Sequence, residues 1–221
     1  MSQTAIEGIR WTTSDLELLP QDEWIRREII DGELFVTRAP EWKHQRTCGK
    51  IFRQLDIWSE STGLGQASIA PGIIFSEADN VIPDVVWASK ERLVILLDEA
   101  GHLTGAPELV VEVLSPGNDN QRRDKEAKLK LYSARGVQEY WIANWQCQTL
   151  EIYRRDNAQL HLIATLIDFL QKSGKGERGR GKAPFFPLTF PLFPVFGLAS
   201  WIFARDDHEL AFTTEDENRF S

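Results

Sequence analysis

One short segment limits the choice of fold more than any other: residues 109–114 read Leu-Val-Val-Glu-Val-Leu. Apart from Glu112, every residue is apolar, on both of the faces that an extended strand presents. A strand of this kind is typical of the interior of a sheet that is covered on both sides. We therefore predict an α/β fold and interpret the other elements around this strand.

The remaining sequence supplies the other parts of a mixed sheet. Asp31-Gly32 between two apolar runs predicts a β-hairpin over 27–36. Helical periodicity predicts a helix over 44–59 that ends before Gly63. A capped helical turn is expected at the beginning of the separate stretch 14–24. Further strands are predicted over 66–76, 81–88, 139–143 and 150–153, and further helices over 90–97 and 122–135. The predicted architecture is a mixed central sheet flanked by helices, with an N-terminal β-hairpin.

Length and composition favour one globular domain. The chain has 221 residues, of which 42% are hydrophobic and 26% are charged, as in ordinary folded proteins. We predict a single domain over 1–221, with a core over 15–170, a basic loop over 172–183 and a C-terminal strap over 184–221.

A cytoplasmic protein is expected. The first twelve residues lack the pattern of a secretory signal. Cys48 and Cys147 show no metal-binding or CxxC spacing, so both are predicted to be reduced, buried thiols. The uncharged stretch 185–203 approaches the length of a membrane span, but it contains three prolines, which argue against a span and for a buried strap.

The net charge of −8 disfavours loose attachment to nucleic acid over the whole surface. It does not exclude an acidic centre that meets phosphate through a bound metal ion. The sequence contains no GxxxxGK[ST], GxGxxG, HExxH or GxSxG motif, so nucleotide-driven, zinc-protease and serine-hydrolase chemistry find no support.

Two acids are candidates for a metal site. Strand alternation gives Asp84 the same face as Val86, and Glu112 the same face as Val110. A carboxylate in an apolar strand loses water, which disfavours its charged form unless a cation compensates. If the strands are neighbours, the two acids can share one Mg²⁺ ion. The alternative is that Glu112 pairs with a buried lysine or arginine.

Lys128 is the candidate cation. In the predicted helix 122–135, Asp124 and Lys128 fall in one arc beside the apolar residues, so Lys128 is predicted to point towards the sheet. There it could orient water and neutralise phosphate, with Asp124 positioning it. The alternative is a lysine whose stem covers apolar surface while its amine reaches solvent.

Several strings together resemble the Uma-type restriction endonuclease family, a branch of the PD-(D/E)XK nuclease superfamily. The resemblance covers about 15–170, and Pro191-Leu192-Phe193-Pro194 resembles the usual end of the family. The matching strings are Asp31-Gly32-Glu33-Leu34, His44-Gln45, Ile82-Pro83-Asp84-Val85-Val86, the segment 107–116, Asp124…Lys128…Tyr132 and the segment 136–142.

The resemblance implies a restriction-endonuclease-like core that uses Mg²⁺ or Mn²⁺ to hydrolyse phosphodiester bonds in DNA. It implies that Asp84 and Glu112 bind the metal ion, with the carbonyl of Val113 as a third ligand, and that Lys128 is the catalytic lysine. Two residues after Glu112, where the wider superfamily has lysine, this chain has Leu114; the Uma-type family places its lysine on the next helix. A homodimer is expected by analogy, because cutting both strands needs two centres.

Five further residues have weaker assignments. Glu33 is the candidate for an additional catalytic acid or is a surface residue of its strand. His44 and Gln45 are candidates for contact with water or phosphate, although a histidine at a helix start is often a cap. Arg122 and Arg123 are candidates for DNA phosphate contacts or are ordinary surface charge, and the basic loop is a further candidate.

A second function stays open at this stage. The negative charge and Leu114 are also consistent with a catalytically inactive nuclease fold that acts as a DNA-binding or protein-interaction module. Either function predicts the same architecture.

Overall fold

A computed structural model describes residues 9–20, 22, 24–117 and 121–169. The predicted basic loop, the strap and the stretch 185–203 lie outside these residues. Among the helices that are described, none combines the length and the apolar character needed to cross a membrane. The elements are α1 (Thr13–Leu18), β1 (Ile25–Ile30), β2 (Glu33–Arg38), α2 (Trp42–Thr62), β3 (Gly65–Ile69), β4 (Ile73–Ser76), β5 (Asp79–Val81), β6 (Val85–Ser89), α3 (Lys90–Leu96), β7 (Leu109–Val113), η1 (Arg123–Lys128), α5 (Leu129–Arg135), β8 (Glu139–Asn144), β9 (Thr149–Asp156) and β10 (Gln159–Ile167).

The described strands form two sheets, and the predicted α/β fold with a mixed sheet is confirmed. The larger sheet has the order β10-β9-β8-β7-β6-β3, and the smaller has the order β2-β1-β5-β4. The segment that suggested a central strand is β7, which runs antiparallel to β6 and parallel to β8. All five of its residues are buried, as its apolar faces predicted.

The N-terminal hairpin forms as predicted and joins the smaller sheet. Asp31 and Gly32 take positive φ values of 50° and 73° between the paired residues Ile30 and Glu33. That conformation matches the twist of the flanking strands, and it explains why Asp-Gly marks the turn. The hairpin brings β1 next to β5.

Two predicted strands were too long, and one was missed. The stretch 66–76 breaks at Ala70, whose φ is 50°, so β3 joins the larger sheet and β4 the smaller. The stretch 81–88 is interrupted at Pro83, which has no N–H to donate to a ladder. Strand β10, at the edge of the larger sheet, had not been predicted.

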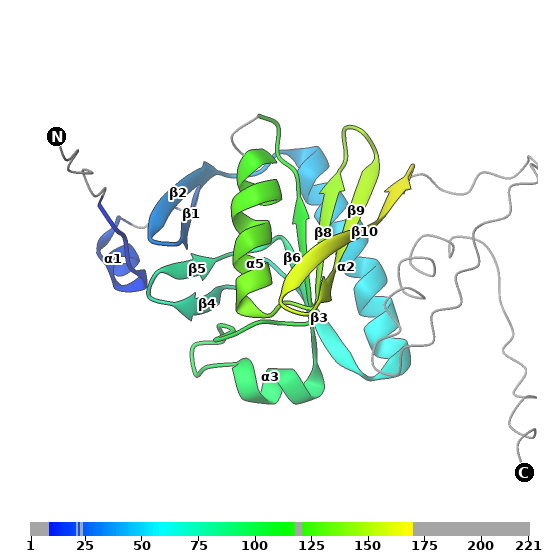
Figure 1. Cartoon of the computed structure of the whole chain (residues 1–221), viewed down its shortest axis with the longest axis horizontal. Helices are drawn as coiled ribbons and strands as arrows, with labels where there is room; N and C mark the ends of the chain where they lie inside the picture. The colour runs from blue at the N-terminus through cyan, green and yellow to red at the C-terminus, as the bar shows by residue number, and fades with distance from the viewer. Residues whose placement is uncertain (1–8, 21, 23, 118–120, 170–221) are drawn as a thin grey trace, which may run out of the picture. The chain divides into compact units, whose positions relative to one another are not determined.

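Helices cover the larger sheet, and α2 packs against β3, β6 and β7 (Figure 1). Trp58 of α2 contacts Trp87 of β6, with ring centroids 5.1 Å apart. Helix α2 ends at Gly63, whose φ of 67° closes the helix as predicted. On α5, Leu131 and Tyr132 belong to the core cluster that contains Val110 of β7.

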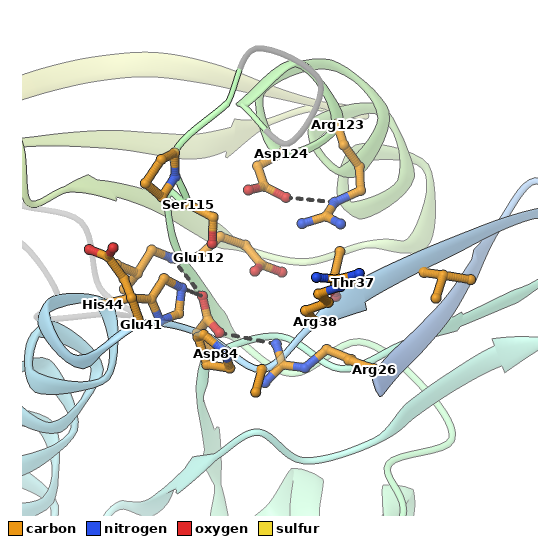
Figure 2. A pocket seen from close by; sticks show the side chains of 15 residues that line it. Arg26, Thr37, Arg38, Glu41, His44, Asp84, Glu112, Ser115, Arg123 and Asp124 are labelled. Carbon is orange, nitrogen blue, oxygen red and sulfur yellow. Dashed lines mark hydrogen bonds and ion pairs between the residues drawn. The ribbon is translucent and has the colours of Figure 1, made fainter. Parts of the chain in front are cut away.

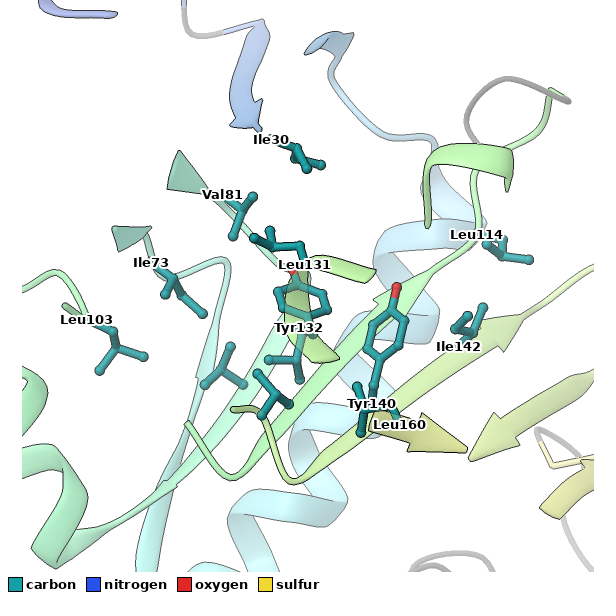
Figure 3. Close-up of a cluster of buried hydrophobic side chains, with 13 residues drawn as sticks. Ile30, Ile73, Val81, Leu103, Leu114, Leu131, Tyr132, Tyr140, Ile142 and Leu160 are labelled. Carbon is teal, nitrogen blue, oxygen red and sulfur yellow. The ribbon is translucent and has the colours of Figure 1, made fainter. Parts of the chain in front are cut away.

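That core cluster connects the two sheets through α5 (Figure 3). Ile30 and Val81 come from the smaller sheet, Tyr140 comes from the larger, and Tyr132 lies between them on α5. Burying a large apolar side chain contributes roughly 1.5–3 kcal/mol. The packing of this cluster therefore fixes α5, and the segment η1 just before it, against β7, the strand that carries Glu112.

The helix predicted over 122–135 contains a π-helical segment, η1, close to its start and continues as α5. Asp124 and Lys128 are both buried, as the predicted arc required. Gly136, with a φ of 94°, ends α5. Single π-helical turns inside α-helices are frequent at functional sites, and this one carries both charged residues towards the sheet.

Candidate functional site

Asp84 lies just before β6 and is held by three donors (Figure 2). Its Oδ2 accepts the backbone N–H of Val113 at 2.8 Å and lies 3.3 Å from Nε2 of His44. Its Oδ1 accepts a hydrogen bond from Arg26 at 3.1 Å. Burial by itself favours a neutral carboxyl, but His44, Arg26 and the Val113 N–H outweigh it and lower the pKa of Asp84 to about 2. Asp84 is therefore ionised at neutral pH.

Glu112, on β7, is equally buried but differently partnered. Its Oε1 accepts hydrogen bonds from Lys128 Nζ at 2.8 Å and from the Tyr132 hydroxyl at 3.0 Å. Burial raises the pKa of Glu112 to about 8 despite Lys128, and the nearby charges of Asp84 and Asp124 act in the same direction. A divalent cation would supply the charge that ionised Glu112 lacks.

Lys128 is buried under the site, with 1% of its surface exposed, rather than reaching solvent. Its Nζ lies 2.8 Å from Glu112, 3.0 Å from Glu28 and 3.9 Å from Asp124. Burial alone would lower the pKa of Lys128, but these carboxylates raise it above its usual value. The side chain is therefore an ammonium, suited to stabilising negative charge and not to accepting a proton.

Glu28 is the acid that the sequence analysis missed. It lies on β1 with 1% of its surface exposed, and its Oε1 accepts the backbone N–H of Ile82 at 2.9 Å. Glu33, proposed for an additional acid, is exposed and lines a separate cavity of about 820 Å³. The available signal was the pair Arg26 and Glu28, which are two residues apart on one strand and so share a face.

A pocket of about 400 Å³ collects the predicted metal ligands, and we call it the acidic pocket. Lys128 is not among its described lining residues, but it donates a hydrogen bond to Glu112, which lines the pocket. Gln45 is exposed outside it, and Arg122 lines the larger cavity instead. The lining residues are Arg26, Val36, Thr37, Arg38, Ala39, Pro40, Glu41, His44, Asp84, Glu112, Val113, Ser115, Pro116, Arg123 and Asp124 (Figure 2).

The charges around the acidic pocket leave room for a cation. Arg123 approaches the pocket from η1 and donates a hydrogen bond to Asp124 at 3.0 Å. Four acidic residues and three arginines line the pocket, and the carboxylate oxygens suit Mg²⁺ or Mn²⁺. The acids are Glu41, Asp84, Glu112 and Asp124, and the arginines are Arg26, Arg38 and Arg123, while Glu28 and Lys128 form an ion pair outside the described lining.

His44 and Cys48, which are both on α2, lie beside Asp84. His44 Nδ1 is 3.5 Å from the sulfur of Cys48, which is 1% exposed. Their spacing of four residues, which places two side chains on one helix face, went unnoticed in the sequence. The prediction of two buried thiols was wrong for Cys147, which is exposed, while both cysteines are free as expected.

The chain matches a known family and a solved fold. The sequence model of the Uma2 family, described as "Putative restriction endonuclease", matches residues 13–173. No curated protein matches the chain. A solved structure, described as a "putative nuclease belonging to DUF820" from Anabaena variabilis, is 21% identical, with a TM-score of 0.55 over 68% of this chain and 83% of that one. At that identity it supports the fold alone. The predicted resemblance is confirmed, and the chain belongs to the Uma2 restriction endonuclease family.

Proposed function

We propose that the protein is a divalent-metal-dependent endonuclease that hydrolyses phosphodiester bonds in DNA. One observation carries the proposal: Asp84 and Glu112, which are 28 residues apart in the sequence, line one pocket together with Glu41 and Asp124. Membership of the Uma2 family supports the nuclease class.

In this proposal, Asp84, Glu112 and the carbonyl of Val113 hold Mg²⁺ or Mn²⁺. Such ions accept one or two carboxylates and fill their remaining positions with water and phosphate oxygens. The ion supplies Lewis-acid stabilisation of the charge that develops on the phosphate.

The surrounding residues orient these ligands. Lys128 and Tyr132 hold one oxygen of Glu112, and the N–H of Val113 holds one oxygen of Asp84. Lys128 is therefore a positioning residue that also adds positive charge below the pocket. Arg123 lines the pocket wall and would contact a DNA phosphate there.

A binding module without catalysis is the second candidate, and a specific observation favours it. Arg26 occupies one oxygen of Asp84, and Lys128 occupies one oxygen of Glu112, so both acids already have a cation. A metal ion must compete with Arg26 for Asp84.

Nicking of supercoiled plasmid in Mg²⁺ or Mn²⁺ distinguishes the two functions. We expect Asp84→Asn to lower the nicking rate at least about 100-fold, because it removes a charged ligand from the reacting centre. Glu33→Gln is the control: it removes an exposed acid outside the acidic pocket and should keep the wild-type rate.

Equal nicking by the wild type and Asp84→Asn would identify a contaminating nuclease. No nicking with either ion, together with DNA retention in a gel-shift assay, would favour the binding module. A homodimer and a cytoplasmic location belong to the nuclease proposal by analogy, and sedimentation equilibrium of the purified protein tests the dimer.

A further inference from the structure

We propose that His44, Cys48 and Asp84 form a binding site for a thiophilic divalent cation, with Zn²⁺ as the probe ion. Each offers one ligand atom, and these atoms lie within 4.8 Å of one another. Among the residues that the structure describes, no other three histidine, cysteine or acidic side chains meet this criterion. Glu112 is not a member, so this cluster differs from the ligand set proposed for Mg²⁺.

The donor types select the ion. Zn²⁺ binds cysteine sulfur, histidine nitrogen and carboxylate oxygen, whereas Mg²⁺ takes oxygen ligands almost exclusively. Zinc bonds of about 2.0–2.3 Å place tetrahedral ligand atoms about 3.3–3.8 Å apart. His44 Nε2 lies 3.3 Å from Asp84 Oδ2, whereas the other ring nitrogen, Nδ1, lies 3.5 Å from Cys48 Sγ. An ion uses one of these nitrogens, so the side chains of His44 and Cys48 must rotate to bring ligand atoms that start within 4.8 Å of one another to the spacing of a zinc site.

The surroundings supply the rest of a site. His44 and Cys48 project from one face of the 21-residue helix α2, whose core-facing side is fixed by Leu55 and Trp58. The Val113 N–H, 2.8 Å from Asp84 Oδ2, keeps the carboxylate in place. His44 and Asp84 line the acidic pocket, whose volume of about 400 Å³ gives an ion an entrance and room for water as a fourth ligand. Binding converts the Cys48 thiol to a thiolate and releases its proton to solvent.

A rival interpretation is a catalytic triad, in which Cys48 is the nucleophile, His44 is the base and Asp84 orients His44. Cys48 does not fit that role. It is 1% exposed, and burial, reinforced by the charges of Asp84 and Glu112, raises the pKa of its thiol far above the usual range. A buried neutral thiol is inert towards substrates, whereas a divalent cation stabilises its thiolate.

The consequence for activity rests on the proposed nuclease function. Asp84 belongs both to this cluster and to the hard-metal site, so an ion held by His44 and Cys48 withdraws Asp84 from Mg²⁺. Micromolar Zn²⁺ should therefore inhibit Mg²⁺-dependent nicking, and Cys48→Ser should relieve the inhibition.

Cobalt spectroscopy tests the binding site without DNA. Equimolar Co²⁺ added to the full chain should give a sulfur-to-cobalt charge-transfer band in the near ultraviolet, and Zn²⁺ should abolish it. Cys147→Ser, which removes the exposed thiol, should keep the band. Cys48→Ala and the similar-sized Cys48→Ser should lose it and bind Co²⁺ at least about tenfold more weakly, with folding checked by far-ultraviolet circular dichroism.

The absence of a band in the wild type would overturn the proposal without reference to any variant. So would a band that survives in folded Cys48→Ser or disappears in Cys147→Ser. Because cobalt binding is read without DNA, a protein that gives the band and cuts no plasmid would keep this site and lose only the nuclease proposal.

Discussion

The two acids of the acidic pocket lie in opposite surroundings. Asp84 is met by donors, including the N–H of Val113 and His44, and its pKa falls to about 2. Glu112 shares its one ammonium with Glu28, and burial raises its pKa to about 8. Equal burial therefore gives one permanent anion and one group that keeps its proton near neutrality.

A cation that binds both acids would displace a different group at each. At Asp84 it must displace the Arg26 guanidinium, and at Glu112 it must displace a proton. Two similar carboxylates whose surroundings separate their pKa values are a recognised basis for dividing roles within a site. The following changes test each half of the comparison.

The largest effect is expected from Lys128→Met. Removing the ammonium breaks the buried ion pair with Glu28 and takes a hydrogen-bond donor from Glu112, and breaking a buried ion pair costs about 3–5 kcal/mol. The melting temperature should fall by about 6–20 °C. Lys125→Met is the control, because its partly exposed pair with Glu151 contributes at most about 1 kcal/mol. Equal falls in melting temperature would contradict this expectation, because they would show that the buried contacts of Lys128 stabilise the fold no more than the partly exposed pair of Lys125.

A smaller effect concerns the pH dependence of stability. The folded state raises the pKa of Glu112 from 4.5 to about 8, so between these values the native protein binds more protons than the unfolded chain. Stability from this group is full below pH 4.5 and is lost as the pH rises through 8.

Glu112→Gln cannot ionise and should escape that loss. Between the two ends of this pH window, its melting temperature relative to wild type should rise by about 10 °C, because the change in pKa from 4.5 to about 8 corresponds to about 5 kcal/mol. Glu126→Gln, on the exposed side of η1, should follow the wild type. Parallel pH profiles for the wild type and Glu112→Gln would contradict a protonated Glu112.

The smallest effect is expected at the Asp84 half. Arg26→Ala removes the cation that competes for Asp84, so apparent Mn²⁺ affinity should rise about 3–10-fold, as measured by the thermal shift at increasing Mn²⁺. Arg10→Ala, which breaks the exposed pair with Asp31, should leave it unchanged. Weaker Mn²⁺ binding by Arg26→Ala would mean that Arg26 supports the metal site instead of competing with it.

The sequence was most informative where local chemistry decides the outcome. Asp31-Gly32 identified its turn, and the apolar run around Glu112 identified the central strand. The helical period placed Lys128 on the buried side. Each of these predictions depends on residues that are close in sequence. The strand and the helix come together because packing their apolar faces removes apolar surface from water.

Glu28 could not be recognised in the same way. Alternation places it on one face with Arg26, but Glu28, Ile29 and Ile30 are all buried, so the pattern does not tell which face is covered. Its burial depends on Ile82 and Lys128, which are distant in sequence. The π-helical turn was equally hidden, because it is defined by backbone hydrogen bonds and not by residue types.

The hairpin strand β1 connects both halves of the pocket. Arg26 reaches Asp84 and Glu28 reaches Lys128, from positions two residues apart. Any displacement of this strand would therefore remove one positive and one negative group together. The net charge around the pocket would stay the same, while Asp84 would lose its guanidinium and Lys128 one of its carboxylates.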